Sequence, residues 1–468
     1  MLEGNIKVFE VGVVLAYLLA CLAIGVLCAR RATASEEEYW VGGRFLSKTA
    51  GAFAVFAVVG SASTIMGSAG MAYRMGLPVV AAVCAGFALQ FPLIAYITAK
   101  PLLDRNICTL GDFFKETIGG RHVQWAYSLL TLIFMAAYVV PQLKASGIIG
   151  QWLMGDSFEY STVVLIMGFT FLLYSSIGGM WAVTITDIIQ GAIMMIGVVA
   201  LGVVILIQPG GFPELVEKGV AAMPKITKMG FPAITAVGLA MIWGLWGLVA
   251  PMTVMRVLTM QNGKSARRSL LLGSVFAVVT IATAMLIALA AADINPNLSQ
   301  PDMAFIVTME KYFSPVVCGF LVASLFAAIM SSTDSFLLSC SATIARDIYK
   351  HLINPDASEK TIIRLGMISI WVVGFITIFI SMGQLPLISV LAGLAAGGLI
   401  SAFCAPLVLG LYWNKLSRNG VFLGMVTGFF CFVVLNRTGA VPALSELLFA
   451  VPLSLVFTVA GSLMSPNK

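Results

Sequence analysis

Charged residues are scarce in this sequence. Asp, Glu, Lys and Arg make up 10% of its 468 residues, whereas hydrophobic residues make up 60%. Soluble domains carry about 25% charged residues, so the composition excludes a soluble globular protein and indicates a polytopic membrane protein. The net charge of +6 does not indicate nucleic-acid binding, because the basic residues fall in short loops between apolar segments, where they orient the chain.

The residues that build metal and catalytic centres are few or scattered. The two histidines, His122 and His351, have no neighbours in the sequence that would complete a metal site or a catalytic dyad. The eight cysteines show no paired spacing, so we expect reduced packing residues rather than disulfides. Glycine motifs that bind nucleotides are also missing. These gaps argue against an enzyme, and they imply that any solute transport draws on an ion gradient.

What the sequence does contain is a series of long apolar segments. A membrane-spanning helix needs about 17 or more apolar residues. By this measure we predict an all-α membrane protein with thirteen transmembrane helices in a single transporter domain. These spans cover residues 8–28, 49–72, 78–99, 123–152, 161–177, 181–207, 234–255, 269–292, 313–345, 362–382, 385–411, 420–436 and 442–464.

Lys and Arg are distributed unequally over the connections between these spans. Most of them fall in one alternating set of connections, which includes Arg30, Arg256 and Arg346. Connections rich in Lys and Arg stay in the cytoplasm. We therefore predict an integral protein of the cell (inner or plasma) membrane with its N-terminus outside and its C-terminus inside, as an odd number of spans requires.

The segment 319–350 carries hydroxyls and an acid through an apolar helix. Ser324, Ala328, Ser331, Ser335 and Ser339 recur at spacings of three and four, so they lie on one face. Sodium is a hard cation that prefers oxygen ligands, which such a face supplies. The alternative is that these small residues only permit close helix packing. An acid favours the cation site, because packing does not require a charge, and Asp334 flanks this face.

Two other spans contain residues that interrupt a helix. Span 49–72 has a Gly/Ser cluster, Gly60 to Thr64, at its centre. Broken helices are tolerated at this depth where they face a cavity or an ion, although small residues also occur at simple packing faces. Span 234–255 has Gly244, Gly247 and Pro251, which indicate a bend. Its indoles at Trp243 and Trp246 either line an organic solute or anchor the helix at the membrane interface.

Three ionisable residues stand well inside spans, namely Asp187, Asp334 and Lys144. A charge at the bilayer centre costs about 2.5 to 3.5 kcal/mol, so such residues are functional candidates. Lys144 either binds a solute or extends its ammonium group to the interface.

The interrupted spans open two blocks of five spans each, 49–207 and 234–411. Because five is odd, the second block is inverted relative to the first, and this symmetry is typical of secondary transporters built from inverted repeats.

Three stretches resemble the sodium:solute symporter family: GGMWAVTITDIIQ at 178–190, AAIMSSTDSFLLSCSATIARDIYK at 327–350 and SAFCAPLVLGLYWNKLSRNGVFLGMVTG at 401–428. This family includes transporters of sugars, proline, pantothenate, sialic acid, monocarboxylates and choline. The resemblance implies a LeuT-type fold, in which the two blocks form a ten-helix core with one extra N-terminal and two extra C-terminal helices.

The resemblance also implies sodium as the coupling ion and suggests its ligands. The principal site would use the backbone carbonyls of Ala57, Gly60 and Ala328 with the hydroxyls of Ser331 and Ser332. Some members bind a second sodium, whose ligands here would be Asp187, Ser331, Asp334 and Ser335. Where the sialic acid transporters have a serine, this chain has Asp334, so that acid either binds sodium or carries a proton.

The solute is less well defined. Sugar transporters of this family have polar groups in the third span, where this chain has Ala81 to Gly86, and this disfavours a sugar. The segment WGLWGLVAPMTVMR at 243–256 has the spacing of the proline branch, yet the aspartate of that branch is Val59 here. We expect a small organic anion or zwitterion. The candidate residues for binding it are Ser61, Thr64, Lys144, Trp243 and Trp246.

Three alternatives stay open at this point: a sensor that retains the transporter fold, transport coupled to protons, and a channel.

Overall fold

The computed structural model describes residues 6–155, 158–383 and 385–465, and their regular structure is helical apart from a bridge between Leu46 and Met260. Ten helices in these residues are long and apolar enough to span a membrane. They are α1 (Val8–Ala32), α5 to α6 (Pro78–Leu103), α8 (Arg121–Met154), the second part of α9 (Ser175–Leu206), α13 (Gly263–Ile294), α15 with η7 (Pro315–Ile353), α16 (Glu359–Ser381), α17 (Ile388–Tyr412), α18 (Arg418–Thr438) and α19 (Leu447–Met464).

Two further spans are bent pairs of helices. The first joins α3 (Lys48–Val59) to η2 (Ser63–Gly67) and α4 (Ser68–Met75) with a bend of 65°. The second joins α11 (Ala233–Val249) to α12 (Pro251–Leu258) with a bend of 47°. Pro251 explains the second bend, because proline starts a helix well but cannot continue one. Both interruptions that we predicted from Gly, Ser and Pro are confirmed.

The remaining predicted span is the first part of α9, the shorter apolar helix Tyr160–Leu173. Although α9 runs over Tyr160–Leu206, its backbone leaves helical geometry at Gly179, with φ 51° and ψ −158°. Glycine suits this backbone conformation, and a Cβ atom here would also approach Tyr39 to 2.9 Å. With these two parts counted separately, the thirteen predicted spans each have a helical counterpart.

Short helices lie between the spans. They are α2 (Glu36–Trp40), η1 (Gly42–Arg44), α7 (Leu110–Thr117), α10 (Gly211–Ala222), η5 (Pro224–Thr227), η6 (Pro301–Met303) and α14 (Ala304–Tyr312). Within the longer spans, η3 (Ile94–Thr98) connects α5 (Pro78–Leu93) to α6 (Ala99–Leu103), and η7 (Thr343–Ile353) continues α15 (Pro315–Ala342).

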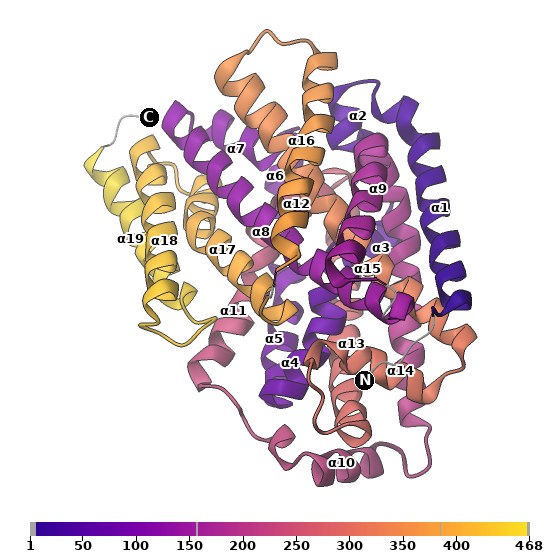
Figure 1. Ribbon diagram of the computed structural model, residues 1–468. Coiled ribbons are helices and arrows are strands. Elements are labelled where there is room, and N and C mark those ends of the chain that lie inside the picture. Colours follow the sequence, from indigo (N-terminus) through magenta and orange to yellow (C-terminus); the bar gives the residue numbers. More distant parts are fainter. Residues whose placement is uncertain (1–5, 156–157, 384, 466–468) are drawn as a thin grey trace.

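The hydroxyl-bearing helix α15 lies at the centre of the bundle (Figure 1), where it packs against α1, α3, α8, α9 and α16. Each of its residues from Leu321 to Ala342 is buried. By contrast, α1 lies at one side of the bundle, and α18 and α19 lie at the other (Figure 1). A helix with hydroxyls and an acid can occupy such a centre only if the neighbouring helices supply partners for its polar groups.

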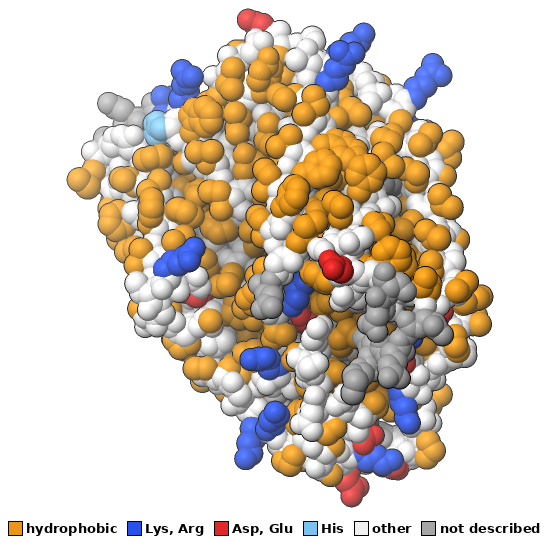
Figure 2. Space-filling model, in the orientation of Figure 1, with side chains coloured by type: hydrophobic (Ala, Val, Ile, Leu, Met, Phe, Trp, Pro, Cys, Tyr) orange, Lys and Arg blue, Asp and Glu red, His pale blue; other side chains and the backbone are white. Residues whose placement is uncertain are grey.

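The outside of the bundle has the character expected in a bilayer. Hydrophobic side chains cover much of the face in Figure 2, and the charged side chains that project furthest from it lie at the upper and lower ends. The start of α1 lies toward the lower end of the bundle and the end of α19 toward the upper end (Figure 1). An odd number of spans requires such an arrangement.

Candidate functional site

The break in the second span faces α15 and releases two backbone carbonyls toward it. In a regular helix, the N–H groups of Ser61 and Ala62 would bond to the carbonyls of Ala57 and Val58. Here Ser61 N bonds to Val59 O at 2.9 Å, and Ala62 N bonds to the side chain of Gln142 at 3.1 Å. The carbonyls of Ala57 and Val58 are therefore free to accept other donors.

Those donors come from α15. The Ser331 hydroxyl donates to Ala57 O at 2.8 Å and lies 3.1 Å from Ala328 O, and the Ser332 hydroxyl donates to Val58 O at 3.2 Å. Both serines are fully buried. The structure thus brings Ala57, Ala328 and Ser331 together as predicted, with Ser332 beside them. Carbonyl and hydroxyl oxygens gathered in this way suit a hard monovalent cation.

Gly60 lies at the end of α3, where the chain leaves the helix with φ −70° and ψ 74°. A Cβ atom at this position would come within 2.5 Å of the Met194 methyl group and 2.9 Å of Phe56 O. The close approach of α9, which carries Met194, explains why a glycine stands at the break.

One member of the predicted second group of ligands, Asp187, forms a buried ion pair with a residue outside that group. Asp187 on α9 accepts a hydrogen bond from Arg256 on α12, and the two side chains are 0% and 1% exposed. Arg256 also donates to Thr184 and lies 3.5 Å from the Ser335 hydroxyl.

The prediction that Arg256 belongs to a cytoplasmic connection is wrong. The chain bends by 47° at Ala250 and continues as α12, whose residues, Arg256 among them, are buried. The charge count missed this residue, because a connection was assumed to begin where the apolar run ends. Arg256 stands five residues after Pro251, so the helix that this proline starts could have been expected to include it.

Asp334 accepts a hydrogen bond from Ser175 of α9 through Oδ1. Among the described residues, Asp334 Oδ2 and Asp187 Oδ1 are buried atoms with no hydrogen-bond partner. Two carboxylates beside one guanidinium leave one negative charge. A buried charge of this kind calls for a monovalent cation or a proton.

The predicted solute residues separate into two groups. Ser61 and Thr64 line the inside of the break, with the Ser61 hydroxyl 2.6 Å from that of Ser63 and 3.3 Å from that of Thr64. Trp246 stacks on Tyr138, with 5.0 Å between ring centroids, and the Tyr138 hydroxyl lies 3.4 Å from that of Ser63. The structure therefore brings Ser61, Thr64 and Trp246 to one place.

Trp243 and Lys144 lie elsewhere. Trp243 stacks on Phe87 of α5 at 5.2 Å. The Lys144 ammonium contacts Asp302 Oδ2 at 2.7 Å and Pro386 O at 2.8 Å. These contacts connect α8, η6 and the chain ahead of α17 across a cavity of about 530 Å³ that also includes Arg74.

Two residues of α8 near the break were missed. Tyr138 contacts both Trp246 and Phe336, the latter with ring centroids 4.4 Å apart. Gln142 accepts from Ala62 N, and its buried Nε2 has no partner among the described residues. Polar residues four positions apart share a helix face, so the spacing of Tyr138 and Gln142 could have identified them.

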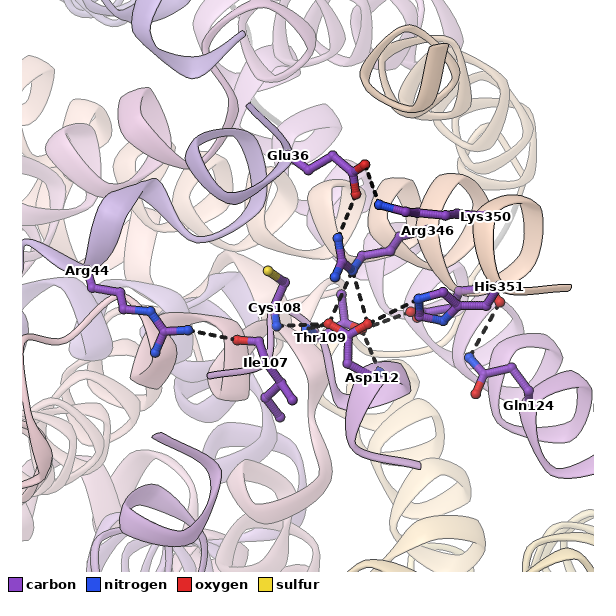
Figure 3. Close-up of polar contacts among 11 residues, drawn as sticks. Glu36, Arg44, Ile107, Cys108, Thr109, Asp112, Gln124, Arg346, Lys350 and His351 are labelled. Carbon is purple, nitrogen blue, oxygen red and sulfur yellow. Dashed lines mark hydrogen bonds and ion pairs between the residues drawn. The ribbon is translucent and has the colours of Figure 1, made fainter. Parts of the chain in front are cut away.

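A third polar group joins α2, α7 and η7 (Figure 3). In Figure 1, α7 lies toward the upper end of the bundle, whereas α14, which follows the Lys144 partner Asp302, lies toward the lower end. Arg346 of η7 donates to Glu36 of α2 at 2.6 Å and to both carboxylate oxygens of Asp112 of α7, at 3.0 and 3.1 Å, while Lys350 contacts Glu36 at 2.6 Å. Burial raises the pKa of the Asp112 carboxyl, but Arg346, His351 and the Cys108 N–H outweigh it and hold this pKa below its usual value. These ion pairs hold α2 and α7 against the end of the central helix.

Comparisons with known proteins identify the family and the fold of this chain. The model of the sodium:solute symporter family matches residues 39–428. Sodium/proline symporter 2 of Staphylococcus saprophyticus is 29% identical over 431 residues, which are 89% of this chain and 83% of that protein. The sodium/proline symporter of Staphylococcus aureus strain JH9 is 28% identical over 429 residues, which are 88% of this chain and 83% of that protein.

Solved structures show the same fold. A Na+-coupled sialic acid symporter in a substrate-bound outward-open state superposes with a TM-score of 0.83 at 18% identity, covering 97% of this chain and 98% of that one. A nucleobase-cation-symport-1 family transporter in a closed conformation has a TM-score of 0.58 at 12% identity, covering 92% and 96%.

The buried ion pair gives a first prediction. Arg256→Met should lower the unfolding free energy by about 3 to 5 kcal/mol, because it leaves the Asp187 carboxylate buried without its partner. The double variant Arg256→Met/Asp187→Asn should regain part of this loss. Thermal unfolding of the purified protein measures both.

The control is the exposed pair Lys100–Asp104, at 2.8 Å, where Lys100→Met should leave the unfolding temperature close to that of the wild type, because solvent screens the pair. If Arg256→Met is as stable as Lys100→Met, the buried ion pair does not contribute more to stability than the exposed one.

Proposed function

This chain belongs to the sodium:solute symporter family, and we propose that the solute it carries with sodium is a small carboxylate or zwitterion. As a member, it is an integral membrane protein that couples the movement of a small organic solute to the sodium gradient.

The principal sodium site is the part of the proposal with the strongest support. Sodium binds the carbonyls of Ala57, Gly60 and Ala328 and the hydroxyls of Ser331 and Ser332. The single observation behind this assignment is that the break turns two N–H groups away from their carbonyls, at the place where two buried α15 hydroxyls meet those carbonyls. An ion at this point joins α3 to α15, so sodium binding favours one arrangement of the broken helix.

A second cation site lies between Asp187, Asp334 and Ser335. Arg256 balances only one of the two acids, and each acid keeps one buried oxygen without a hydrogen-bond partner among the described residues. Either a second sodium or a proton fits the remaining charge, and Asp334 determines which of them is coupled to the solute.

The solute binds beside the break, against Tyr138, Gln142 and Trp246. The rings offer an apolar surface, and the free amide of Gln142 offers a donor. The helix that begins at Ser63 points its N-terminal end toward the break, and this end favours a carboxylate. The relatives that transport proline support a zwitterion with a small apolar body.

Trp243 and Lys144 take other roles in this proposal. Trp243 packs α11 against α5. Lys144 closes the outer side through Asp302, since binding a solute carboxylate would break its present ion pair. Ser389 contributes to the same closure by donating to Ser63 O at 3.2 Å.

Transport then proceeds by alternating access. The Lys144 contacts separate at one end and the Arg346 contacts at the other, one set at a time. When a zwitterion moves with one sodium ion, one net charge crosses 100 mV and releases about 2.3 kcal/mol, and a tenfold sodium gradient adds about 1.4 kcal/mol. A single sodium ion therefore supports a solute ratio of several hundred.

We assign the N-terminus to the outside of the cell membrane and the C-terminus to the cytoplasm. The excess of Lys and Arg in one set of connections supports this orientation. We also assign residues 49–207 and 234–411 to two inverted repeats, and the bends of 65° and 47° in the first span of each block support this assignment.

Ser331→Ala and Ser332→Ala should each raise the sodium concentration for half-maximal uptake about tenfold. Each removes one oxygen ligand of a charged ion, which is worth about 1.5 kcal/mol or more. Uptake of labelled proline into proteoliposomes, measured over a range of sodium concentrations, tests this. Ser324→Ala is the matched control, because that hydroxyl bonds within its own helix, to Leu321 O at 2.6 Å. Equal sodium dependence in all three variants would contradict the assignment.

Asp334→Asn should reduce the number of cations moved per solute by one, because it removes the charge that the second cation balances. The reversal potential of solute-dependent current measures this number directly. If the number of cations moved per solute is unchanged at several sodium and proton gradients, Asp334 has a structural role.

Trp246→Phe should raise the solute concentration for half-maximal uptake several-fold, whereas Trp243→Phe should leave it close to wild type. Both indoles are buried, but only Trp246 lies beside the break. A thermal-shift panel of amino acids, small carboxylates, sugars and choline, with and without sodium, identifies the solute to use. Stabilisation by a sugar alone would contradict the proposed solute class.

A further inference from the structure

Three potential metal ligands meet at the end of the bundle that carries the Arg346 ion pairs. Asp112 of α7 and Asp347 and His351 of η7 each present one ligand atom, and these atoms lie within 4.8 Å of one another. Figure 3 shows His351 beside Asp112. His351 Nε2 is 3.3 Å from Asp112 Oδ1. The sequence conceals this group, because α7 and η7 are far apart along the chain.

Asp347 is the member that most requires a ligand. It is fully buried, and its Oδ1 accepts one hydrogen bond, from the Thr109 hydroxyl at 2.8 Å. Its Oδ2 has no hydrogen-bond partner in the described part of the chain, and neither has His351 Nδ1. A buried carboxylate oxygen without a donor is costly, and a bound cation or a proton removes this cost.

The charges around the cluster lead to the same conclusion. Arg346 and Lys350 both contact Glu36, and Arg346 also contacts Asp112. These two fixed cations are thus shared between two acids, and the ion pairs formed by the described residues include none with Asp347. Among the described residues Asp347 therefore has no direct salt-bridge partner, and Arg346 offsets its charge only from beyond salt-bridge distance.

We propose that Asp112, Asp347 and His351 bind a divalent transition metal such as Zn²⁺. One imidazole nitrogen with two carboxylate oxygens is a ligand set typical of zinc and its neighbours, whereas Mg²⁺ and Ca²⁺ prefer oxygen alone. Tetrahedral bonds of about 2.1 Å place ligand atoms roughly 3.4 Å apart. His351 Nε2 and Asp112 Oδ1 are 3.3 Å apart, and all three ligand atoms lie within 4.8 Å of one another. Arg346 donates to both oxygens of Asp112 and so fixes the orientation of that carboxylate.

A metal at this point connects α7 to η7 and adds to the contacts that close this end. It therefore stabilises the closed arrangement and slows opening, because a ligand favours the state that it binds better. This effect on transport rests on the proposed alternating access, whereas the site itself does not.

The site is tested by titrating the metal-free, full-length protein with Zn²⁺ and with Mg²⁺ as a control. We expect Zn²⁺ to bind with a stoichiometry of one and to raise the melting temperature, and Mg²⁺ to do neither. His351→Ala and Asp347→Asn should each lower the Zn²⁺ affinity at least tenfold. His122→Ala is the matched control, because His122 is the other histidine of the chain and lies outside the cluster. Equal Zn²⁺ binding by the His351→Ala and His122→Ala variants overturns the site, as does no binding by the wild type.

Spectra of the Co²⁺ form test the ligands independently. Tetrahedral coordination by nitrogen and oxygen supports the site, whereas a thiolate charge-transfer band shows binding to a cysteine and overturns it. If His351→Ala does not fold, Asp347→Asn, which keeps the shape of the side chain, carries the comparison.

The effect on transport is measured in proteoliposomes with Zn²⁺ on the side of α7. Slower uptake by the wild type, with Asp347→Asn insensitive, supports the closing role. Unchanged uptake at saturating Zn²⁺ overturns that role and leaves the site standing. Absence of sodium-dependent uptake by the wild type without Zn²⁺ contradicts the proposed function instead, and the titration still tests the metal site.

Discussion

A bilayer offers no water to backbone groups, so every N–H and carbonyl inside it needs a partner in the protein. The break after α3 meets this requirement with side chains. The side chain of Gln142 accepts a hydrogen bond from the N–H of Ala62. The hydroxyls of Ser331 and Ser332 donate to the carbonyls of Ala57 and Val58. The central helix is consequently both the scaffold of the bundle and the partner of its broken span. An ion that binds between them acts on the element that holds the fold together.

The buried charged side chains also need partners within the protein. Each buried acid of the centre lies next to a group that offsets its charge or donates to it, as Arg256 does for Asp187 and Ser175 for Asp334. Asp334 has no ion-pair partner among the described residues, and the second cation site that we propose lies beside it. Toward the two ends, Lys144–Asp302 and Arg346–Asp112 connect helices that are distant in the sequence.

The sequence predicted the spans and the broken helices well, because both follow from local composition. Glycine, serine and proline interrupt a helix wherever they stand, so the break at Gly60 and the bend before Pro251 could be located. It also predicted that Ser331 lies on a helix face with other small and hydroxyl-bearing residues, since this depends only on spacing along one helix. It misplaced Arg256, left Gln142 unnoticed and did not identify Asp302 as the partner of Lys144, because these assignments depend on which helices meet. The partner of Arg256 is 69 residues away, and that of Lys144 is 158 residues away.

The sequence by itself determined that this chain spans a membrane, where its helices break and which face of the central helix carries oxygen. Hydropathy, backbone preference and helical period are properties of neighbouring residues. Only the tertiary structure decided which charges cancel. It paired Asp187 with Arg256 and Lys144 with Asp302, and it brought His351 to Asp112 and Asp347. Electrostatic energy depends on distance in space, and only packing brings these groups within a few ångströms of one another.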